Sequence, residues 1–486
     1  MTLAAGHSRQ ADQSATTPLP RVRNAAWVLA VCCAAQFLVV LDVTVVNIAL
    51  PSIQADFHLS DGGRQWIINA YAVSFAGFLM LGARLGDKYG RRRVFMIGIA
   101  LFTVFDVLGG LAPNGPWLIA ARAGQGLGGA ILAPATLSML TVTFPQREER
   151  RRALGLWSTF AASGASAGLV TGGVLTQFLD WRWIFFIKVP VGLFLLMAAH
   201  LYVPADQRST HRGRIDVAGA LTITLGLGLA AYGIAEAGQQ SWSSPVTLGA
   251  IAAGLACLAL FILVEQRFAA DPLVPLQIFR NRTLSVANGI AAIVGSALFG
   301  MYYFVSLYLR EVNGYSALQS GFAFVPAGLA TVAGALAGTR LVKRLGIRRQ
   351  ITLGLALAAA GLAWLSLTTP SAPYGAHILG PLILTGSGLG LSFVPTTQAG
   401  TENAPPQHAG LASGLITTTR QFGAAVGLAA MVTIAEANTS HSPSPGATAL
   451  SNGYTSAFAV NAAILLAGVL LAQVLPAHTK QKTPAP

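Results

Sequence analysis

The stretch GARLGDKYGRRR, residues 82–93, returns as GTRLVKRLGIRR at residues 338–349. Six of the twelve positions are identical, among them Gly90 with Gly346 and the closing pair of arginines. Large membrane proteins are often built from duplicated halves, so the repeat predicts two related halves. A chance match between two short loops rich in glycine and arginine is the alternative. The copies lie 256 residues apart, more than six membrane helices need, which predicts two added helices between the halves.

The composition independently indicates a membrane protein. Of the 486 residues, 53% are hydrophobic and only 10% are charged, whereas soluble domains carry about 25% charged residues. Such a chain cannot cover itself with a polar surface, and it is too apolar to be disordered. The predicted class is an all-α integral membrane protein.

A helix needs about 20 apolar residues to cross the hydrocarbon core, and fourteen segments of the chain qualify. We expect spans at residues 25–48, 65–83, 94–111, 117–140, 153–178, 184–203, 216–236, 246–264, 284–309, 320–342, 351–368, 376–394, 411–436 and 455–475.

Basic residues predict the orientation of these spans. Of the 31 lysines and arginines, 25 fall on the side of the N-terminus and three on the other side, at Arg64, Arg182 and Arg310. Cytoplasmic loops carry such an excess, so both termini are expected in the cytoplasm of a multi-pass protein of the cell (plasma or inner) membrane. The net charge of +14 then reflects topology, and nucleic acid is not an expected partner.

The repeat and the spans together predict an arrangement of 6+2+6 helices. The expected divisions are an N-terminal tail at 1–24, a six-helix bundle at 25–204, an inserted helix pair with its linkers at 205–282, a second six-helix bundle at 283–475 and a C-terminal tail at 476–486.

Several chemistries lack their motifs in this sequence. A phosphate-binding loop of the Walker A kind needs a lysine directly after glycine, and none of the five lysines follows a glycine. The sequence also has no HExxH or CxxC pattern, so neither a metal site nor an enzyme is expected, and no cofactor.

Charged side chains inside spans are costly and therefore predict function. Asp42 lies within span 25–48, Asp106 within span 94–111 and Arg122 near the outer end of span 117–140. Arg122 needs a carboxylate or carbonyl partner, and Asp42 is the expected one, with Gln125 one helical turn away adding a donor and an acceptor. Asp42 is the candidate proton carrier; a structural ion pair or a helix cap is the alternative for it, and a solvated site for Asp106.

Glycines recur along span 153–178. Gly164, Gly168, Gly172 and Gly173 lie in GASAGLVTGG, a spacing that lets helices approach closely. Gly423 and Gly427 hold the corresponding place in the second half. Packing is the simpler interpretation, and a gating interface is the alternative.

These segments resemble the major facilitator superfamily, specifically its fourteen-helix drug:proton antiporters of the EmrB/QacA kind. The resemblance covers nearly all of residues 25–475. It rests on LDVTVVNIALP (41–51), RQWIINAY (64–71), RLGDKYGRRR (84–93), RAGQGLGGAILAPA (122–135), WRWIFFIKVPVG (181–192), PLVPLQIFRNRT (272–283) and GLASGLITTTRQFG (410–423).

The resemblance implies roles for individual residues. It implies a cytoplasmic gate at Asp87, Gly90, Arg91 and Arg92, a span-4 motif at Arg122, Gln125 and Gly126, and proton coupling through Asp42, Arg122 and Asp106.

Several positions depart from the family's pattern, among them three inside the predicted spans. Leu169 replaces the usual proline of the span-5 motif, which puts a hinge there in doubt. Lys188 replaces an expected asparagine, and Asp106 an expected small residue. These two extra charges are expected either to pair or to bear on the choice of substrate.

The resemblance implies multidrug or antibiotic efflux, driven by the proton-motive force, with alternating access between the halves. The expected partners are the lipid bilayer, protons and small lipophilic drugs, cationic drugs among them. The protein is expected to be a monomer. Trp66, Tyr71, Phe75 and Tyr303 are candidate pocket residues, with packing or lipid contact as the alternative. Export of one endogenous metabolite, uptake by symport and a non-transporting sensor or scaffold remain alternatives.

Overall fold

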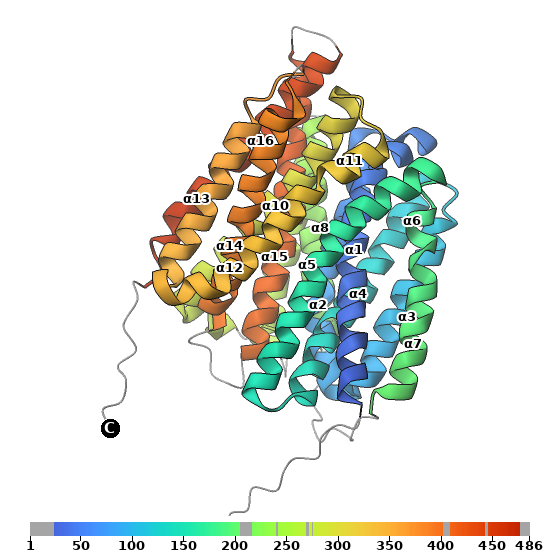
Figure 1. Cartoon of the computed structure of the whole chain (residues 1–486), viewed down its shortest axis with the longest axis vertical. Helices are drawn as coiled ribbons and strands as arrows, with labels where there is room; N and C mark the ends of the chain where they lie inside the picture. Colours follow the sequence, from blue (N-terminus) through green and yellow to red (C-terminus); the bar gives the residue numbers. More distant parts are fainter. Residues whose placement is uncertain are drawn as a thin grey trace, which may run out of the picture.

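The structure is a computed structural model that describes residues 24–204, 216–239, 242–268, 272–274, 276–370, 372–401, 409–442 and 446–476. Throughout these ranges the regular structure is helical, and the helices lie side by side in one elongated bundle (Figure 1). We call the end where α1 finishes and α2 begins the distal end of the bundle.

The first half begins with long helices and ends with a broken one. Its last predicted span is divided at Ile187, three residues before Pro190. Proline has no N–H to donate to the carbonyl four residues earlier, which explains a break at this place. The helices are α1 (Ala25–Phe57), α2 (Asp61–Tyr89), α3 (Arg91–Gly110), α4 (Gly115–Thr143), α5 (Arg147–Phe178), α6 (Trp183–Phe186) and α7 (Lys188–Tyr202).

Two further helices follow, as the spacing of the repeat predicts. They are α8 (Val217–Gln239) and α9 (Pro245–Leu263), the latter continued by the π-helix η1 (Val264–Phe268). α8 packs against α9, against α2 of the first half and against α15 of the second. α8 therefore lies along the seam between the halves, and α9 is joined to the bundle through α8.

The second half also contains a broken helix, but in its second span rather than its last. A break at Phe324, just before Pro326, separates a short helix from a long one. The elements are η2 (Leu276–Arg280), α10 (Arg282–Leu307), η3 (Tyr308–Val312), α11 (Ala317–Ala323), α12 (Val325–Leu345), α13 (Ile347–Leu365), η4 (Gly375–Leu379), α14 (Gly380–Thr401), α15 (Ala409–Ser440) and α16 (Ala447–Ala472).

Within the described ranges, thirteen helical segments are long and apolar enough to cross a bilayer. They cover every predicted span except 351–368, which corresponds to α13. This helix of 19 residues packs against α14 and α16 as a member of the bundle. With α13 counted, the fold has the predicted fourteen helices.

The repeated loops have the same backbone geometry. Gly90 ends α2 with φ 97°, and Gly346 ends α12 with φ 76°. A side chain is strained at positive φ, so this conformation explains why both copies of the repeat keep a glycine there.

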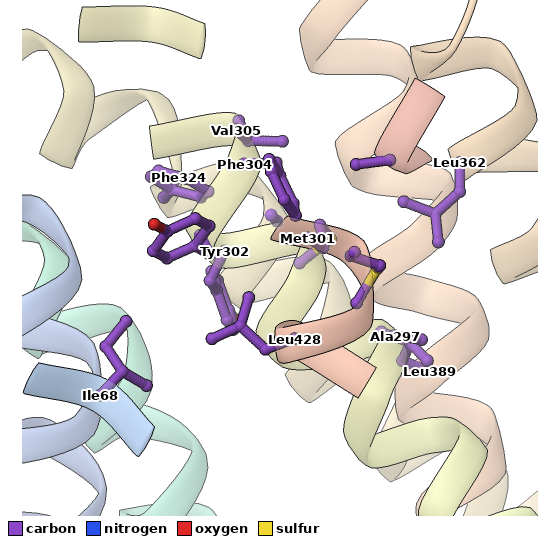
Figure 2. Close-up of a cluster of buried hydrophobic side chains, with 14 of the residues drawn as sticks. Ile68, Ala297, Met301, Tyr302, Phe304, Val305, Phe324, Leu362, Leu389 and Leu428 are labelled. Atoms are coloured by element: carbon purple, nitrogen blue, oxygen red, sulfur yellow. The ribbon is translucent and has the colours of Figure 1, made fainter. Parts of the chain in front are cut away.

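The halves share apolar contacts as well as backbone contacts. Ile68 of α2 and Tyr302 of α10 belong to one buried cluster that also includes Leu428 of α15 (Figure 2). Close approach of α5 to α11 is possible because a Cβ on Gly173 would lie 2.7 Å from the Ala317 carbonyl oxygen.

Candidate functional site

A network of charged side chains lies inside the first half. Arg122 of α4 donates from Nη1 to Oδ2 of Asp42 in α1, at 2.6 Å. Lys188, at the start of α7, pairs with both Asp42 and Asp106 of α3. Gln125 donates to Asp106 and accepts from Arg122. We call these five residues the buried ion network.

The network balances its charge among side chains that are buried from solvent. Asp42 and Asp106 are fully buried, and Arg122 and Lys188 are each only 1% exposed. Two acids face two bases, which offsets the large cost of taking single charges out of water. Lys188 lies at a helix N-terminus, an unfavourable place for a cation. Its ion pairs with Asp42 and Asp106 offset this cost.

The helix backbones bring Arg122 to its partners. A Cβ on Gly126 would lie 2.4 Å from the Tyr71 carbonyl oxygen, so this glycine lets α4 approach α2 closely. At that distance Arg122 Nε donates to the Ile67 carbonyl at 3.1 Å. The guanidinium also lies 4.5 Å from the centre of the Tyr71 ring, a favourable cation–π arrangement.

A second polar cluster joins the two halves at the distal end. Arg64 of α2 forms an ion pair of 2.6 Å with Glu311 of η3 and donates from Nε to the Tyr303 hydroxyl at 3.2 Å. The Tyr454 hydroxyl of α16 donates to Glu311. We call these four residues the distal latch.

Further bonds strengthen the same junction. Arg310 donates to the Ile48 carbonyl at 3.0 Å and to the Ser52 hydroxyl at 3.3 Å. Ser306 donates to the Asn47 carbonyl at 3.1 Å. Each of these bonds runs from the second half to α1 of the first half, so the halves are held together by polar contacts near their distal ends.

The sequence profile of the Major Facilitator Superfamily matches residues 32–428 of this chain. The chain belongs to this superfamily. Its members are transporters, not enzymes, and the helical fold described above is theirs.

Curated relatives narrow the comparison. The chain is 39% identical over 486 residues to the "Cephamycin export protein CmcT" of Amycolatopsis lactamdurans, covering 100% of this chain and 98% of the relative. It is also 39% identical over 459 residues to the "Puromycin resistance protein pur8" of Streptomyces alboniger, covering 92% of this chain and 91% of the relative.

Solved structures agree with the fold at much lower identity. A bacterial homologue of the human lysosomal transporter Spinster, in an inward-facing and unoccupied conformation, has a TM-score of 0.65 at 17% identity, covering 93% of this chain and 98% of the other. A D-xylose–proton symporter gives 0.66 at 13% identity, with the same coverage.

The predicted contact between Asp42 and Arg122 is present. The network around it includes more residues than the sequence predicted. Asp106 and Lys188, whose pairing the sequence left open, join the same network. The residues expected to form a cytoplasmic gate are only partly described. Gly90 separates α2 from α3, Arg91 begins α3 and Arg92 donates to the His200 carbonyl, but the Asp87 side chain lies outside the described part.

The span-5 glycines lie against the backbone of α1. A Cβ on Gly164, Gly168 or Gly172 would come within 2.6–2.7 Å of a carbonyl oxygen of that helix. Gly173 instead faces α11 of the second half. Leu169, in place of the expected proline, is fully buried within the continuous helix α5.

The four candidate pocket residues lie in three places. Tyr71 and Phe75 stack at 5.8 Å beside the buried ion network. Tyr303 belongs to the distal latch. Trp66 lies 6.2 Å from Tyr232 of α8. In this conformation the four residues do not line one pocket.

Two buried amides had no predicted role. Gln65 and Asn69 lie one turn apart on α2 and are fully buried, and their side-chain nitrogen and oxygen atoms have no hydrogen-bond partner in the described structure. Both occur in the motif RQWIINAY, which was used only as evidence of resemblance. Unsatisfied buried amides are costly, and that cost distinguishes them from ordinary core residues.

Proposed function

We propose that this chain exports antibiotics or other small lipophilic drugs in exchange for protons, by alternating access of its two halves. The observation that carries the proposal is the buried ion network, because an acid held between two cations can take up a proton only by changing the charge balance of the bundle. The names of the relatives support export as the direction, and membership of the superfamily supports a multi-pass protein of a membrane.

The network provides a physical route from protonation to movement. With both acids ionised, Asp42 and Asp106 balance Arg122 and Lys188. A proton on Asp42 leaves one excess positive charge where the dielectric constant is low, and this weakens the hold of α1 on α4 and α7. Asp42 and Arg122 thus act as the coupling pair, with Asp106 as the second acid.

The distal latch supplies the other state-dependent element. It joins the halves on the side that we assign to the exterior, with both termini in the cytoplasm, so the structure corresponds to a transporter closed to the outside. Opening outward separates Arg64 from Glu311, while the gate at Asp87, Gly90, Arg91 and Arg92 closes the cytoplasmic side. The moving units are residues 25–204 and 283–475, working as a monomer.

The membrane potential can drive such an exchange when net charge moves across the membrane. Moving one elementary charge yields about 2.3 kcal/mol per 100 mV, which corresponds to about fiftyfold accumulation of an exported solute. A transmembrane pH difference adds to this value.

Inside-out vesicles test the proposal directly. We expect a panel of antibiotics, added to energised vesicles, to release protons when the wild-type chain is present. Asp42→Asn should abolish this release and lower drug resistance in a pump-deficient host to that of the empty vector. The control is Asp180→Asn, since Asp180 is an exposed acid that pairs with Arg182 at the surface. Normal resistance in the Asp42→Asn variant would contradict proton-coupled export and favour a sensor or scaffold.

Export of a single endogenous compound is the second candidate. It is favoured by the end-to-end similarity to a relative whose name gives one compound, cephamycin, as what it exports. The same panel separates the two candidates: a multidrug exporter responds to several unrelated scaffolds, whereas a dedicated exporter responds to one.

A further inference from the structure

The second half contains a charged side chain that the buried ion network does not explain. Arg420 lies on α15, eleven residues after the helix begins at Ala409. With a rise of 1.5 Å per residue, this places it about 17 Å along a helix of 32 residues, inside the apolar segment Gly414–Ser440. Among the residues that the structure describes, it has neither a hydrogen-bond partner nor an ion-pair partner.

Arg420 faces a small hollow between three helices. Its guanidinium carbon lies 5.2 Å from the centre of the Phe393 ring. The hollow is lined, besides Arg420, by Ala291 and Val294 of α10, Phe393, Thr396 and Thr397 of α14, and Ile416 of α15.

One side of the hollow is accessible. Arg420, Phe393 and Thr397 are partly exposed, whereas Val294 and Ile416 behind them are buried. The charge and the ring therefore lie at the mouth of the hollow, and the aliphatic side chains form its floor.

Arg420 is the donor that this hollow can offer to a ligand. The hydroxyl of Thr396 already donates to the Ser392 carbonyl at 2.7 Å, and that of Thr397 to the Phe393 carbonyl at 3.1 Å. A guanidinium, in contrast, presents five N–H groups in a planar fork that matches a carboxylate. Its permanent charge at this depth is costly unless an anion compensates it.

The hollow also indicates the charge and shape of that anion. One guanidinium is neutralised by one negative charge, so a monoanion leaves no excess charge in the bundle, whereas a phosphate dianion would. The hollow itself holds only about 10 Å³, room for a small charged group, so an apolar body attached to that group would lie outside it against the Phe393 ring.

We propose that Arg420 binds the carboxylate of an organic-acid substrate whose aromatic or aliphatic body packs against Phe393. That the bound acid is a transported substrate rests on the proposed export function, whereas its binding to Arg420 does not. The assignment differs from the cationic drugs expected from the resemblance, and it separates the substrate subsite in the second half from the proton-coupling acids in the first.

Binding to the purified full-length protein tests this assignment without a proton gradient. The probes are benzoate and 2-naphthoate, each compared with its methyl ester, and the readout is the dissociation constant. We expect wild type to bind the acids more tightly than the esters. Arg420→Gln should weaken acid binding about tenfold or more, the loss of one charge-assisted contact, and leave ester binding unchanged. Arg420→Lys should fall between, because it keeps the charge but loses the fork.

Two further variants keep the test decisive if Arg420→Gln folds poorly. Thr397→Asp places a carboxylate in the same hollow and should exclude acids while sparing esters. Arg348→Gln removes a cation at the surface, where Arg348 donates to Gln473 at 2.8 Å, and should change nothing.

Three results would overturn the assignment. One is that no acid of the panel binds wild type more tightly than its ester. Another is that Arg420→Gln weakens acids and esters equally, and the third is that Thr397→Asp leaves acid binding intact. Failure of proton-coupled export is read separately, from proton release and from Asp42→Asn, so the two proposals can fail independently.

Discussion

The two halves of this chain share their packing but not their charges. In the first half, Gly164 and Gly168 of α5 lie against the backbone of α1. In the second, Gly423 and Gly427 of α15 lie in the same way against α10. The close helix contacts of the duplicated unit are thus kept on both sides.

The charged residues differ at corresponding places. If Gly164 on Phe37 corresponds to Gly423 on Ala292, then Asp42 corresponds to Ala297, which is fully buried and carries no charge. The first half holds two acids and two bases that satisfy one another, while Arg420 of the second half has no polar partner among the residues that the structure describes. The comparison teaches that one scaffold supports a closed charge balance in one half and an unbalanced cation in the other, and our two proposals assign the first to protons and the second to a ligand.

The same substitution in the two halves should have opposite effects on stability. Arg122→Gln leaves Asp42 and Asp106 with Lys188 as their only cation, so we expect a loss of about 3–5 kcal/mol, the cost of breaking a buried ion pair. Arg420→Gln removes a charge that has no partner in the described structure, so stability should be unchanged or higher. Thermal unfolding of the detergent-solubilised variants measures both. A similar loss of stability in the two variants would show that Arg420 has a structural partner. The two halves would then not differ in how their buried charges are balanced.

Part of this site could be predicted from the sequence, for a simple reason. Charges inside spans are so few that Asp42 and Arg122 had little choice of partner. The repeat predicted that the two halves are related. The positive φ at Gly90 and Gly346 explains why both copies of the repeat have a glycine at this position.

The remaining contacts depend on how distant helices rotate against one another. Asp106 and Lys188 are 82 residues apart, and no local pattern fixes the direction in which α3 and α7 face. Glu311 was placed beyond the predicted span 284–309, but η3 extends the helix to Val312 and brings this acid to Arg64, 247 residues away. Counting basic residues for topology treats Arg64 as solvated, whereas its side chain is only 5% exposed.

Breaking the distal latch should have an effect of intermediate size, on the equilibrium between the closed and outward-open states. The latch is a contact between the halves, so it tests what holds them together. Glu311→Gln should favour the outward-open state by about 2 kcal/mol, the typical worth of a charged hydrogen bond, or about thirtyfold in population. Ser52→Cys, in a background without Cys32, Cys33 and Cys257, reports opening through its labelling by an impermeant maleimide.

The matched control for the latch lies within one half. Asp61→Asn removes the acid 3.0 Å from Arg64 on the same helix and leaves the contact between the halves intact, so labelling should stay slow. Equal acceleration by both variants would mean that the charge of Arg64, rather than the bridge between the halves, controls opening.

The smallest expected effect tests the packing that the halves share. A Cβ on Gly168 would lie 2.7 Å from the Leu41 carbonyl oxygen, and one on Gly427 would lie 2.5 Å from Ser296 Cβ. We expect Gly168→Ala and Gly427→Ala each to lower stability by about 1 kcal/mol, the lower end of the cost of overpacking. Gly155→Ala is the control, because nothing lies within 4 Å of its added methyl group, and alanine favours a helix by up to about 1 kcal/mol. Thermal unfolding should therefore rank Gly155→Ala at or above wild type and the other two below it. If only Gly168→Ala loses stability, the halves differ in packing as well as in charge, and the duplicated contact no longer explains the glycines of the second half.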